Sequence, residues 1–188
     1  MLKAMAITDL DDTALMMRCA RGEAPAFRVL ASRLHPPMLR LAVRILGDRA
    51  EAEDALQAAL VKLWQNAARF EAERAAVGAW FRRIVVNACL DRRRALKPVA
   101  SLDAVAEAAA DGADPHTAAE AADRYARVNA AVAGLLPRQR AAIALFYGDG
   151  ATMAEIATIL ETTPKAVEGL LARARAELAQ RLQAETKE

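Results

Sequence analysis

Residues 152–182 read TMAEIATILETTPKAVEGLLARARAELAQRL, two runs of helix-favouring residues separated by a short polar break. Thr152 with Glu155 three residues later predicts a capping box at the start of the first helix, and Pro164 favours the start of a second. The apolar residues that would pack these helices across a three-residue turn are Ile156, Ala157, Leu160, Val167, Leu170, Leu171 and Ala174. The stretch therefore predicts a helix-turn-helix whose second helix can enter a DNA major groove, although an ordinary helical hairpin gives the same pattern.

The composition of the whole chain also favours helix over sheet. Of its 188 residues 48 are alanine, aromatic residues make up 4%, and there are only 8 glycines and 7 prolines. These values exclude a β-sandwich, a collagen-like fibre and a wholly disordered chain. Because alanine supplies so much of the 55% hydrophobic content, we expect two small cores rather than one large one. The predicted fold class is all-α, with two small helical domains joined by a flexible linker.

Several features bear on cellular location. No stretch approaches 18 consecutive apolar residues, so we expect no membrane insertion. The N-terminal residues MLKAMAITDLDD meet three aspartates before any long apolar run, which is not the pattern of a signal peptide. Cys19 and Cys89 are too few for a disulfide framework, which indicates a reducing, cytoplasmic location; one disulfide between them stays open.

Charge divides the chain into three parts. Residues 1–96 carry a net charge of +5, residues 97–120 a net charge of −4, and residues 121–188 a net charge of +1. The middle part, KPVASLDAVAEAAADGADPHTAAE, has few large apolar residues and is bracketed by two prolines, which is typical of a linker. A basic front half of this kind is a hint of nucleic-acid binding.

Apolar spacing and capping residues predict the helices of both domains. Gly47 is a natural C-cap, and Asp48 is expected to begin a long helix that runs to about Trp64. A polar joint at 65–76 should lead to a last helix in the first domain. The other expected helices span residues 13–21, 24–33, 37–46, 77–94, 123–136 and 137–147.

The stretch WFRRIVVNACLDRRR at 80–94 is the strongest candidate for DNA contact in the first domain. It holds five arginines and one acidic residue, Asp91. Arg83, Asn87, Asp91 and Arg94 follow one another at helical spacing, opposite an apolar side that includes Trp80. Arginine with asparagine on one helix face suits phosphate contact and recognition of base edges, whereas a solvated basic face is the simpler interpretation.

Both domains resemble parts of one family. The first is similar to region 2, and the second to region 4, of the extracytoplasmic-function (ECF) sigma factors of the sigma-70 family. In the first domain the similar residues are 45–48, 52–57, 61–64, 80–84, Asn87 and 91–94. In the second domain they are 136–140, 155–157, Val167 and 173–175.

The resemblance implies a protein that binds the β′ and β subunits of core RNA polymerase, needs no cofactor and is controlled by an anti-sigma factor. In the family an acidic helix of region 2 docks on a coiled coil of β′. The residues of this chain at those positions are Asp48, Glu51, Glu53, Asp54 and Gln57. The favourable interaction of acidic groups with a helix N-terminus would explain some of these acids without any partner.

The resemblance also implies two promoter DNA contacts. Region 2 opens the −10 element by taking a base out of the stack, and the residues implied here are Arg82, Arg83, Asn87, Arg92, Arg93 and Arg94. Phe70, Trp80 and Phe81 are the aromatic residues available for stacking, although core packing also explains Trp80 and Phe81. Region 4 binds the −35 element, and the residues implied are Thr163, Lys165, Glu168, Arg173 and Arg175.

The chain departs from the family pattern at two positions of the second domain. Glu168 follows Val167 where basic residues are usual, and Glu161 stands where the family often has glycine. The second departure costs stability if the backbone there needs a positive φ.

The alternatives to a sigma factor are an enzyme and two other kinds of binding protein. No spacing of histidine, cysteine or carboxylate residues suits a metal, and no phosphate-binding loop or nucleophile motif is present, so we expect no enzyme activity. One alternative is a stand-alone helix-turn-helix regulator that binds DNA without polymerase. The other alternative is a helical adaptor that binds only proteins.

Overall fold

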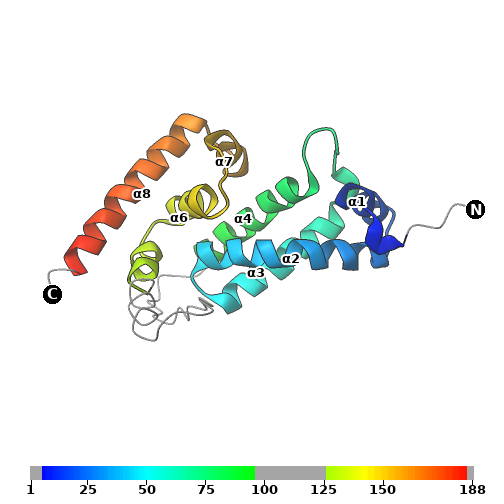
Figure 1. Ribbon diagram of the computed structural model, residues 1–188, viewed down its shortest axis with the longest axis horizontal. Coiled ribbons are helices and arrows are strands. Elements are labelled where there is room, and N and C mark those ends of the chain that lie inside the picture. Colours follow the sequence, from blue (N-terminus) through cyan, green and yellow to red (C-terminus); the bar gives the residue numbers. More distant parts are fainter. Residues whose placement is uncertain (1–5, 96–125, 186–188) are drawn as a thin grey trace, which may run out of the picture.

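The computed structural model describes residues 6–95 and 126–185, and every element in these ranges is helical. The first domain contains η1 (Ile7–Asp9), α1 (Asp12–Ala20), α2 (Ala24–Leu46), α3 (Arg49–Gln65), η2 (Ala67–Arg69) and α4 (Val77–Ala95). Helices α2, α3 and α4 pack along one another, and α1 covers the end nearest the N-terminus (Figure 1). Among the fully buried side chains of this core are Leu15, Leu30, Leu41, Leu56, Phe81 and Val85.

Helix α2 differs from the sequence prediction, which placed separate helices at 24–33 and 37–46. It is one helix of 23 residues that includes Pro36 and Pro37. Proline removes a helical hydrogen bond, but the carbonyls that lose their partners belong to residues 32 and 33, which are exposed and can bind water. The buried stripe Leu30, Leu34, Met38, Leu41 and Ile45 runs through the prolines without a break, so packing outweighs the local cost.

The predicted junction between α2 and α3 is confirmed. Gly47 adopts a φ of 77° and its N–H bonds to the carbonyl of Val43, closing α2. Asp48 then accepts a hydrogen bond from the backbone N–H of Glu51 and caps α3. The turn places the acidic first turn of α3 directly after the end of α2.

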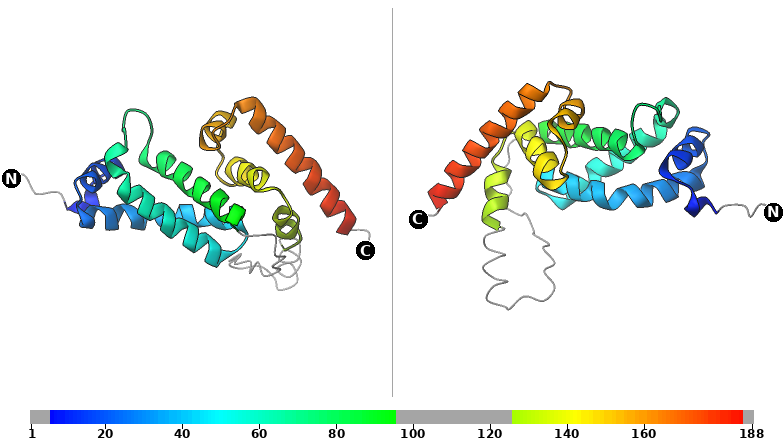
Figure 2. Two further views of the ribbon diagram at one scale, coloured as in Figure 1. Left: turned by 180° about the vertical axis from the view of Figure 1, so that it is seen from behind. Right: turned by 45° about the horizontal axis from the view of Figure 1, so that its top comes forward.

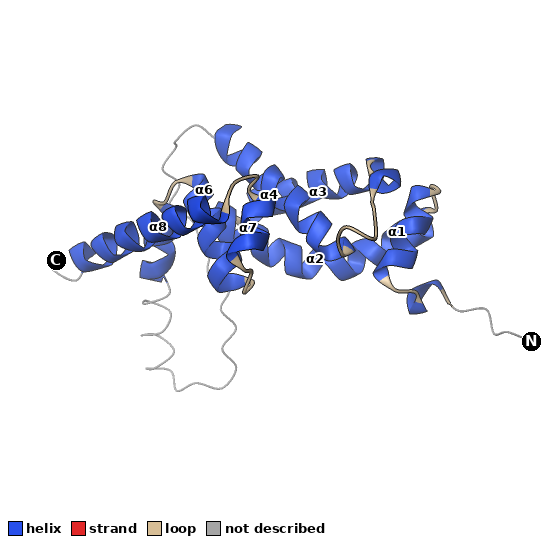
Figure 3. Ribbon diagram, turned by 90° about the horizontal axis from the view of Figure 1, so that it is seen from above, coloured by secondary structure: helices blue, strands red, loops and turns tan. Residues whose placement is uncertain are grey.

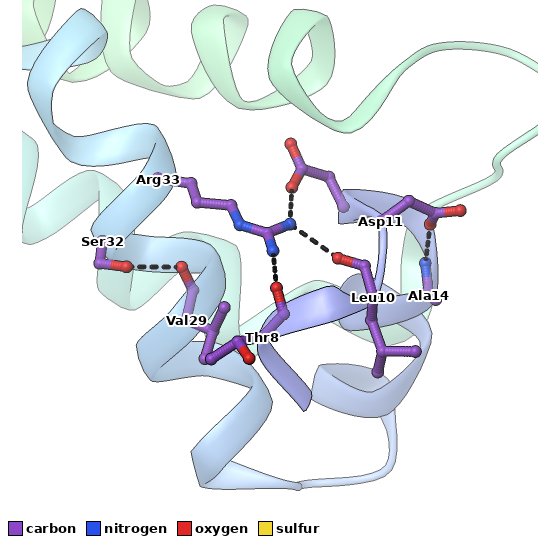
Figure 4. Close-up of polar contacts among 8 residues, drawn as sticks. Thr8, Leu10, Asp11, Ala14, Val29, Ser32 and Arg33 are labelled. Atoms are coloured by element: carbon purple, nitrogen blue, oxygen red, sulfur yellow. Dashed lines mark hydrogen bonds and ion pairs between the residues drawn. The ribbon is translucent and has the colours of Figure 1, made fainter. Parts of the chain in front are cut away.

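Arg33 ties the N-terminal segment to α2 (Figure 4). Its Nη1 donates to the carbonyl of Leu10 at 2.8 Å and to the Asp12 carboxylate at 2.9 Å, and its Nη2 donates to the carbonyl of Thr8. Asp11 caps α1 by accepting from the N–H of Ala14. These bonds hold η1 and α1 against the middle of α2.

The second domain contains α6 (Pro137–Ile143), a π-helical turn η3 (Ala144–Gly148), α7 (Met153–Ile159) and α8 (Pro164–Glu185), and residues 126–133 are also helical. The predicted helix at 137–147 is therefore continuous but widens into a π turn at its end. The Thr152–Glu155 capping box is present, as predicted. Glu161 has a φ of 50°, the positive value for which glycine would be the ordinary choice.

The two domains pack against each other, with α6 against the ends of α2 and α4 and α7 beside α4 (Figures 2 and 3). Ala141, Ala142 and Leu145 belong to the same buried cluster as Ile45 and Leu46. The expectation of two separate cores was therefore wrong for the described residues, because small side chains of α6 continue the first domain's core. The predicted linker, residues 97–120, lies outside the described residues.

Two further sequence expectations can be compared with the described residues. Cys19 and Cys89 are both buried free thiols, so the disulfide left open by the sequence is not formed. Burial raises the pKa of the Cys89 thiol to about 12 and that of Cys19 above its usual value. In the parts of the chain that the structure covers, helices long and apolar enough to cross a membrane are absent.

Candidate nucleic-acid interface

The acidic residues predicted for polymerase contact lie on the exposed side of α3. Glu53, Asp54 and Gln57 are exposed, while the opposite side of the helix buries Ala52 and Leu56. Glu53 forms an exposed ion pair with Arg49 in its own helix, at 3.0 Å. Asp48 accepts the capping hydrogen bond of α3, and Glu51 forms an ion pair with Arg92 of α4. Three of the five residues predicted for polymerase contact therefore remain exposed.

The five arginines of α4 fall into different environments. Arg83 is exposed and Arg93 is half-exposed, and neither forms an ion pair within residues 6–95 and 126–185. Arg94 is exposed and pairs with Asp91 one turn earlier at 2.7 Å. Asn87 lies between them and is half-buried, so the predicted stripe of Arg83, Asn87, Asp91 and Arg94 forms one outward side of the helix.

Arg82, by contrast, points toward the second domain. Its Nε lies 3.3 Å from one carboxylate oxygen of Asp149, and Arg44 donates to the other oxygen at 2.9 Å. The Asp149 side chain is only 14% exposed. Gly148 leaves room for Arg44, since a Cβ there would lie 2.6 Å from its Nη1. A single carboxylate thus holds one arginine from α2 and one from α4.

Arg140 makes the other polar contact between the domains. Its side chain is 1% exposed, and Nη1 donates to the carbonyls of Ile45 and Leu46 at 3.2 and 3.1 Å. Nη2 donates to the carbonyl of Ala133. Burial, with a smaller contribution from the nearby Arg93, lowers the pKa of Arg140 to about 10, so the guanidinium stays charged at neutral pH. Its positive charge lies at the C-terminus of α2, the negative end of the helix dipole.

The second helix of the helix-turn-helix, α8, exposes all five residues predicted for the −35 element. Thr163 caps the helix through a bond from Ala166 N–H at 3.2 Å. Arg175 lies against Tyr147, with its Nε 2.8 Å from the hydroxyl, and Arg173 lines a cavity on another side. Lys165 and Glu168 are also exposed, near the beginning of the helix.

The two domains match two family models in this order. The description Sigma-70 region 2 applies to residues 30–98, and Sigma-70, region 4, to residues 125–178. The ECF RNA polymerase sigma factor SigM of Mycobacterium tuberculosis strain H37Rv is 36% identical over 179 residues, covering 91% of this chain and 84% of SigM. The chain belongs to the ECF sigma factors of the sigma-70 family. It is therefore a transcription initiation factor for RNA polymerase and not an enzyme.

Other relatives agree with this assignment. The ECF RNA polymerase sigma factor SigW of Bacillus subtilis strain 168 is 28% identical over 172 residues, which cover 86% of this chain and 91% of SigW. The solved structure of CnrH in complex with the cytosolic domain of CnrY has a TM-score of 0.66 and 26% identity, covering 92% of this chain and 97% of CnrH. The family assignment replaces the two alternatives left open by the sequence, a stand-alone regulator and a protein-only adaptor.

The aromatic residues considered for base stacking in this sigma factor pack against other side chains of the protein, which is the simpler interpretation given above. Phe81 is fully buried in the core. Trp80 is half-buried and packs edge-to-face on Phe70, with ring centroids 5.6 Å apart. Phe70 lies in the polar joint before α4, so this aromatic pair borders the basic helix on its N-terminal side.

A cavity of about 580 Å³ lies where α4, α6 and α8 meet. Its walls combine apolar side chains with three arginines: Leu90, Leu136, Leu170, Arg94, Arg138 and Arg173. Leu136 is 65% exposed although it is a large apolar residue. The cavity thus offers an apolar floor with a basic rim at the boundary between the two domains.

Sequence reasoning missed the residues that join the domains of the sigma factor. The motif at 136–140 contains Arg140, but nothing in its spacing distinguishes a buried arginine from a solvated one. Asp149 lies between Gly148 and Gly150, outside every predicted helix and motif. One sequence feature could have indicated Asp149: a single acidic residue between two glycines, in a chain whose first domain is rich in arginine.

Proposed function

We propose that this sigma factor binds the β′ and β subunits of core RNA polymerase, with the exposed side of α3 on β′. Glu53, Asp54 and Gln57 supply an acidic and polar surface there, which suits a basic partner. The proposal includes a cytoplasmic location, because bacterial transcription takes place there.

We further propose that the outward side of α4 binds the −10 element. The observation that carries this proposal is a row of exposed Arg83, half-buried Asn87 and exposed Arg94 on a helix whose opposite side buries apolar residues such as Phe81 and Val85. Arginine can neutralise phosphates while asparagine reads a base edge, and the Phe70–Trp80 pair lies beside the row where an unstacked base could rest. Arg82, held by Asp149, and Arg92, held by α3, would contact DNA only after leaving those carboxylates.

The N-terminal part of α8 is proposed to enter the major groove of the −35 element. Thr163 and Lys165 are exposed at the beginning of the helix, where helix-turn-helix proteins contact bases and phosphates. Glu168 is exposed on the same helix and can accept from a cytosine amine. Arg173 and Arg175 would contribute phosphate contacts from the next turns.

An anti-sigma factor is the proposed regulator, and the cavity between the domains is its proposed docking place. The structural relative CnrH was solved in complex with the cytosolic domain of CnrY. In this chain the exposed Leu136 and the rim arginines Arg94, Arg138 and Arg173 suit an amphipathic partner segment with acidic residues. A partner bound there would stabilise the packed arrangement, in which Arg82 is not free.

Transcription with purified components tests the proposal. The protein is mixed with bacterial core polymerase and a pool of genomic fragments, and the 5′ ends of the transcripts are sequenced. We expect discrete starts that share two upstream elements, and their loss with Arg83→Ala/Asn87→Ala. Arg40→Ala is the matched control, because Arg40 is exposed on α2 away from these surfaces. Absence of transcripts, together with no binding to core polymerase in a pull-down, would refute the proposal.

A further inference from the structure

An ion-pair network links the last turn of α4 to the first turn of α3. Arg92 Nε and Nη2 donate to the two carboxylate oxygens of Glu51, the second at 3.1 Å. Nη2 also donates to Asp54 at 3.1 Å. The two parallel bonds between a planar guanidinium and one carboxylate fix orientation as well as distance. The network therefore joins two helices through residues 41 positions apart in the chain.

The family resemblance assigned the members of this pair to different partners, Glu51 to polymerase and Arg92 to DNA. In the structure each is occupied by the other. Both oxygens of Glu51 accept from Arg92, and the side chains are only 26% and 39% exposed. Glu53 and Asp54, at 52% and 60% exposure, remain far more accessible on the same helix. This geometry indicates that the Glu51–Arg92 ion pair links α3 to α4 within the protein.

The packing of α3 explains why such a link is useful. The buried side of α3 consists largely of alanine, at positions 52, 55 and 59, with Leu56 and Leu63. Alanine allows two helices to approach closely but offers little interlocking between side-chain ridges and grooves. The two bonds between Arg92 and Glu51 lie near one end of each helix. They restrain sliding and rotation of α3 against α4, which alanine packing restrains only weakly.

We propose that Glu51 and Arg92 are positioning residues that hold the polymerase-binding side of α3 in a fixed relation to the DNA-binding side of α4. The proposal rests on the function proposed above for those two sides. When α3 is docked on polymerase, the link fixes where Arg83, Asn87 and Arg94 meet the −10 strand. Neither Glu51 nor Arg92 itself contacts polymerase or DNA.

A charge swap separates this role from direct contact. The variants are Glu51→Gln, Arg92→Ala, their combination, and Glu51→Arg/Arg92→Glu. Arg94→Ala is the contrast, because Arg94 is exposed at the same helix end and forms its ion pair with Asp91 of the same helix. Each variant is assembled with core polymerase on a promoter recovered by the transcription experiment. Three quantities are measured: affinity for core polymerase, the salt dependence of promoter binding, and permanganate reactivity of thymines in the −10 region.

We expect Glu51→Gln and Arg92→Ala to reduce open-complex formation by the same factor, about fivefold, with no further loss when they are combined. The charge swap should restore most of the reactivity. Core affinity and the salt slope should stay at the wild-type values, whereas Arg94→Ala should lower the salt slope by about 1. Thermal unfolding of each free variant shows whether it is folded, and Arg92→Lys replaces Arg92→Ala if the latter is not.

Two results would overturn the inference. A salt slope lowered by about 1 in Arg92→Ala would make Arg92 a phosphate contact. A folded charge-swap variant as defective as the single variants would show that the two residues act separately. The proposed function is tested independently by Glu53→Gln/Gln57→Ala, two exposed positions of α3 outside the Arg92 network, which should weaken binding to core polymerase. If it does not, the role of α3 fails, whatever the charge swap shows.

Discussion

Asp149→Asn should loosen the packing between the two domains while leaving each domain folded. The aspartate accepts from Arg44 at 2.9 Å and lies 3.3 Å from Arg82, and it is only 14% exposed. Asparagine keeps the shape and one acceptor oxygen but removes the negative charge shared by two guanidinium groups. Two ion pairs with partly exposed arginines are worth about 1–2 kcal/mol together. The equilibrium between packed and separated domains should therefore shift about 5–30-fold toward separation.

Energy transfer between dyes on the two domains measures this shift. Val61 on α3 and Ala179 on α8 are exposed, and cysteines introduced there can be labelled because Cys19 and Cys89 are buried. Asp91→Asn is the matched control for the transfer efficiency, since it removes the same charge from an ion pair within one helix. Asp149→Asn should lower the transfer efficiency and strengthen binding of the free protein to single-stranded DNA, because Arg82 is released.

Wild-type transfer efficiency and wild-type DNA affinity in Asp149→Asn would refute this reasoning. They would mean that the Arg140 contacts and the apolar contacts alone determine the packing. An equal change in transfer efficiency in Asp91→Asn would refute it as well, because the effect would then follow net charge and not the contact between domains.

Three other variants or conditions test the energetics of the fold. Arg140→Met should destabilise the protein to urea by about 3 kcal/mol, because three backbone carbonyls lose a buried charged donor, while Arg173→Met on the surface should have little effect. Glu161→Gly should raise the free energy of unfolding by about 0.5–1 kcal/mol in thermal melts, because the φ of 50° is unstrained only for glycine; an unchanged or lower melting temperature would contradict this. The N–H and hydroxyl of Thr152 lower the pKa of Glu155, so its stabilising effect should be present above pH 4.5 and be lost as the pH falls below that value. Acid titrations of wild type and Glu155→Gln should converge at low pH, and parallel curves would contradict the assignment.

Helix ends were predictable because their causes are local. The αL cap at Gly47, the Asp48 cap and the Thr152–Glu155 box each depend on residues within four positions of one another. The strained turn at Glu161 was also foreseen, from the residue type that the family usually has there. These features fix where α3 and the helix-turn-helix begin, and so place the acidic side of α3 and the candidate −35 surface.

The failures have the opposite cause, since they depend on residues far apart in the chain. Local rules place a break at Pro36, yet α2 continues because α1, α3 and α4, together with parts of the second domain, pack against it. The family resemblance placed Arg82 and Arg92 on DNA; Arg82 stays a prediction, whereas the structure pairs Arg92 with Glu51 and Asp54. The carboxylates that hold them lie 67 and 41 positions away in the sequence and could not be identified from spacing.

The contact between the two domains allows them to separate as well as to pack together. Its apolar part combines Leu145 of η3 with two alanines of α6, Ala141 and Ala142, which bury little surface and so add little free energy. Its polar part uses groups that find equivalent partners when the domains separate. Water can reach the α2 carbonyls once Arg140 leaves them, and a DNA phosphate can replace the Asp149 carboxylate beside Arg82. Separation therefore leaves no buried group without a partner, and a promoter that binds Arg82 would favour it further.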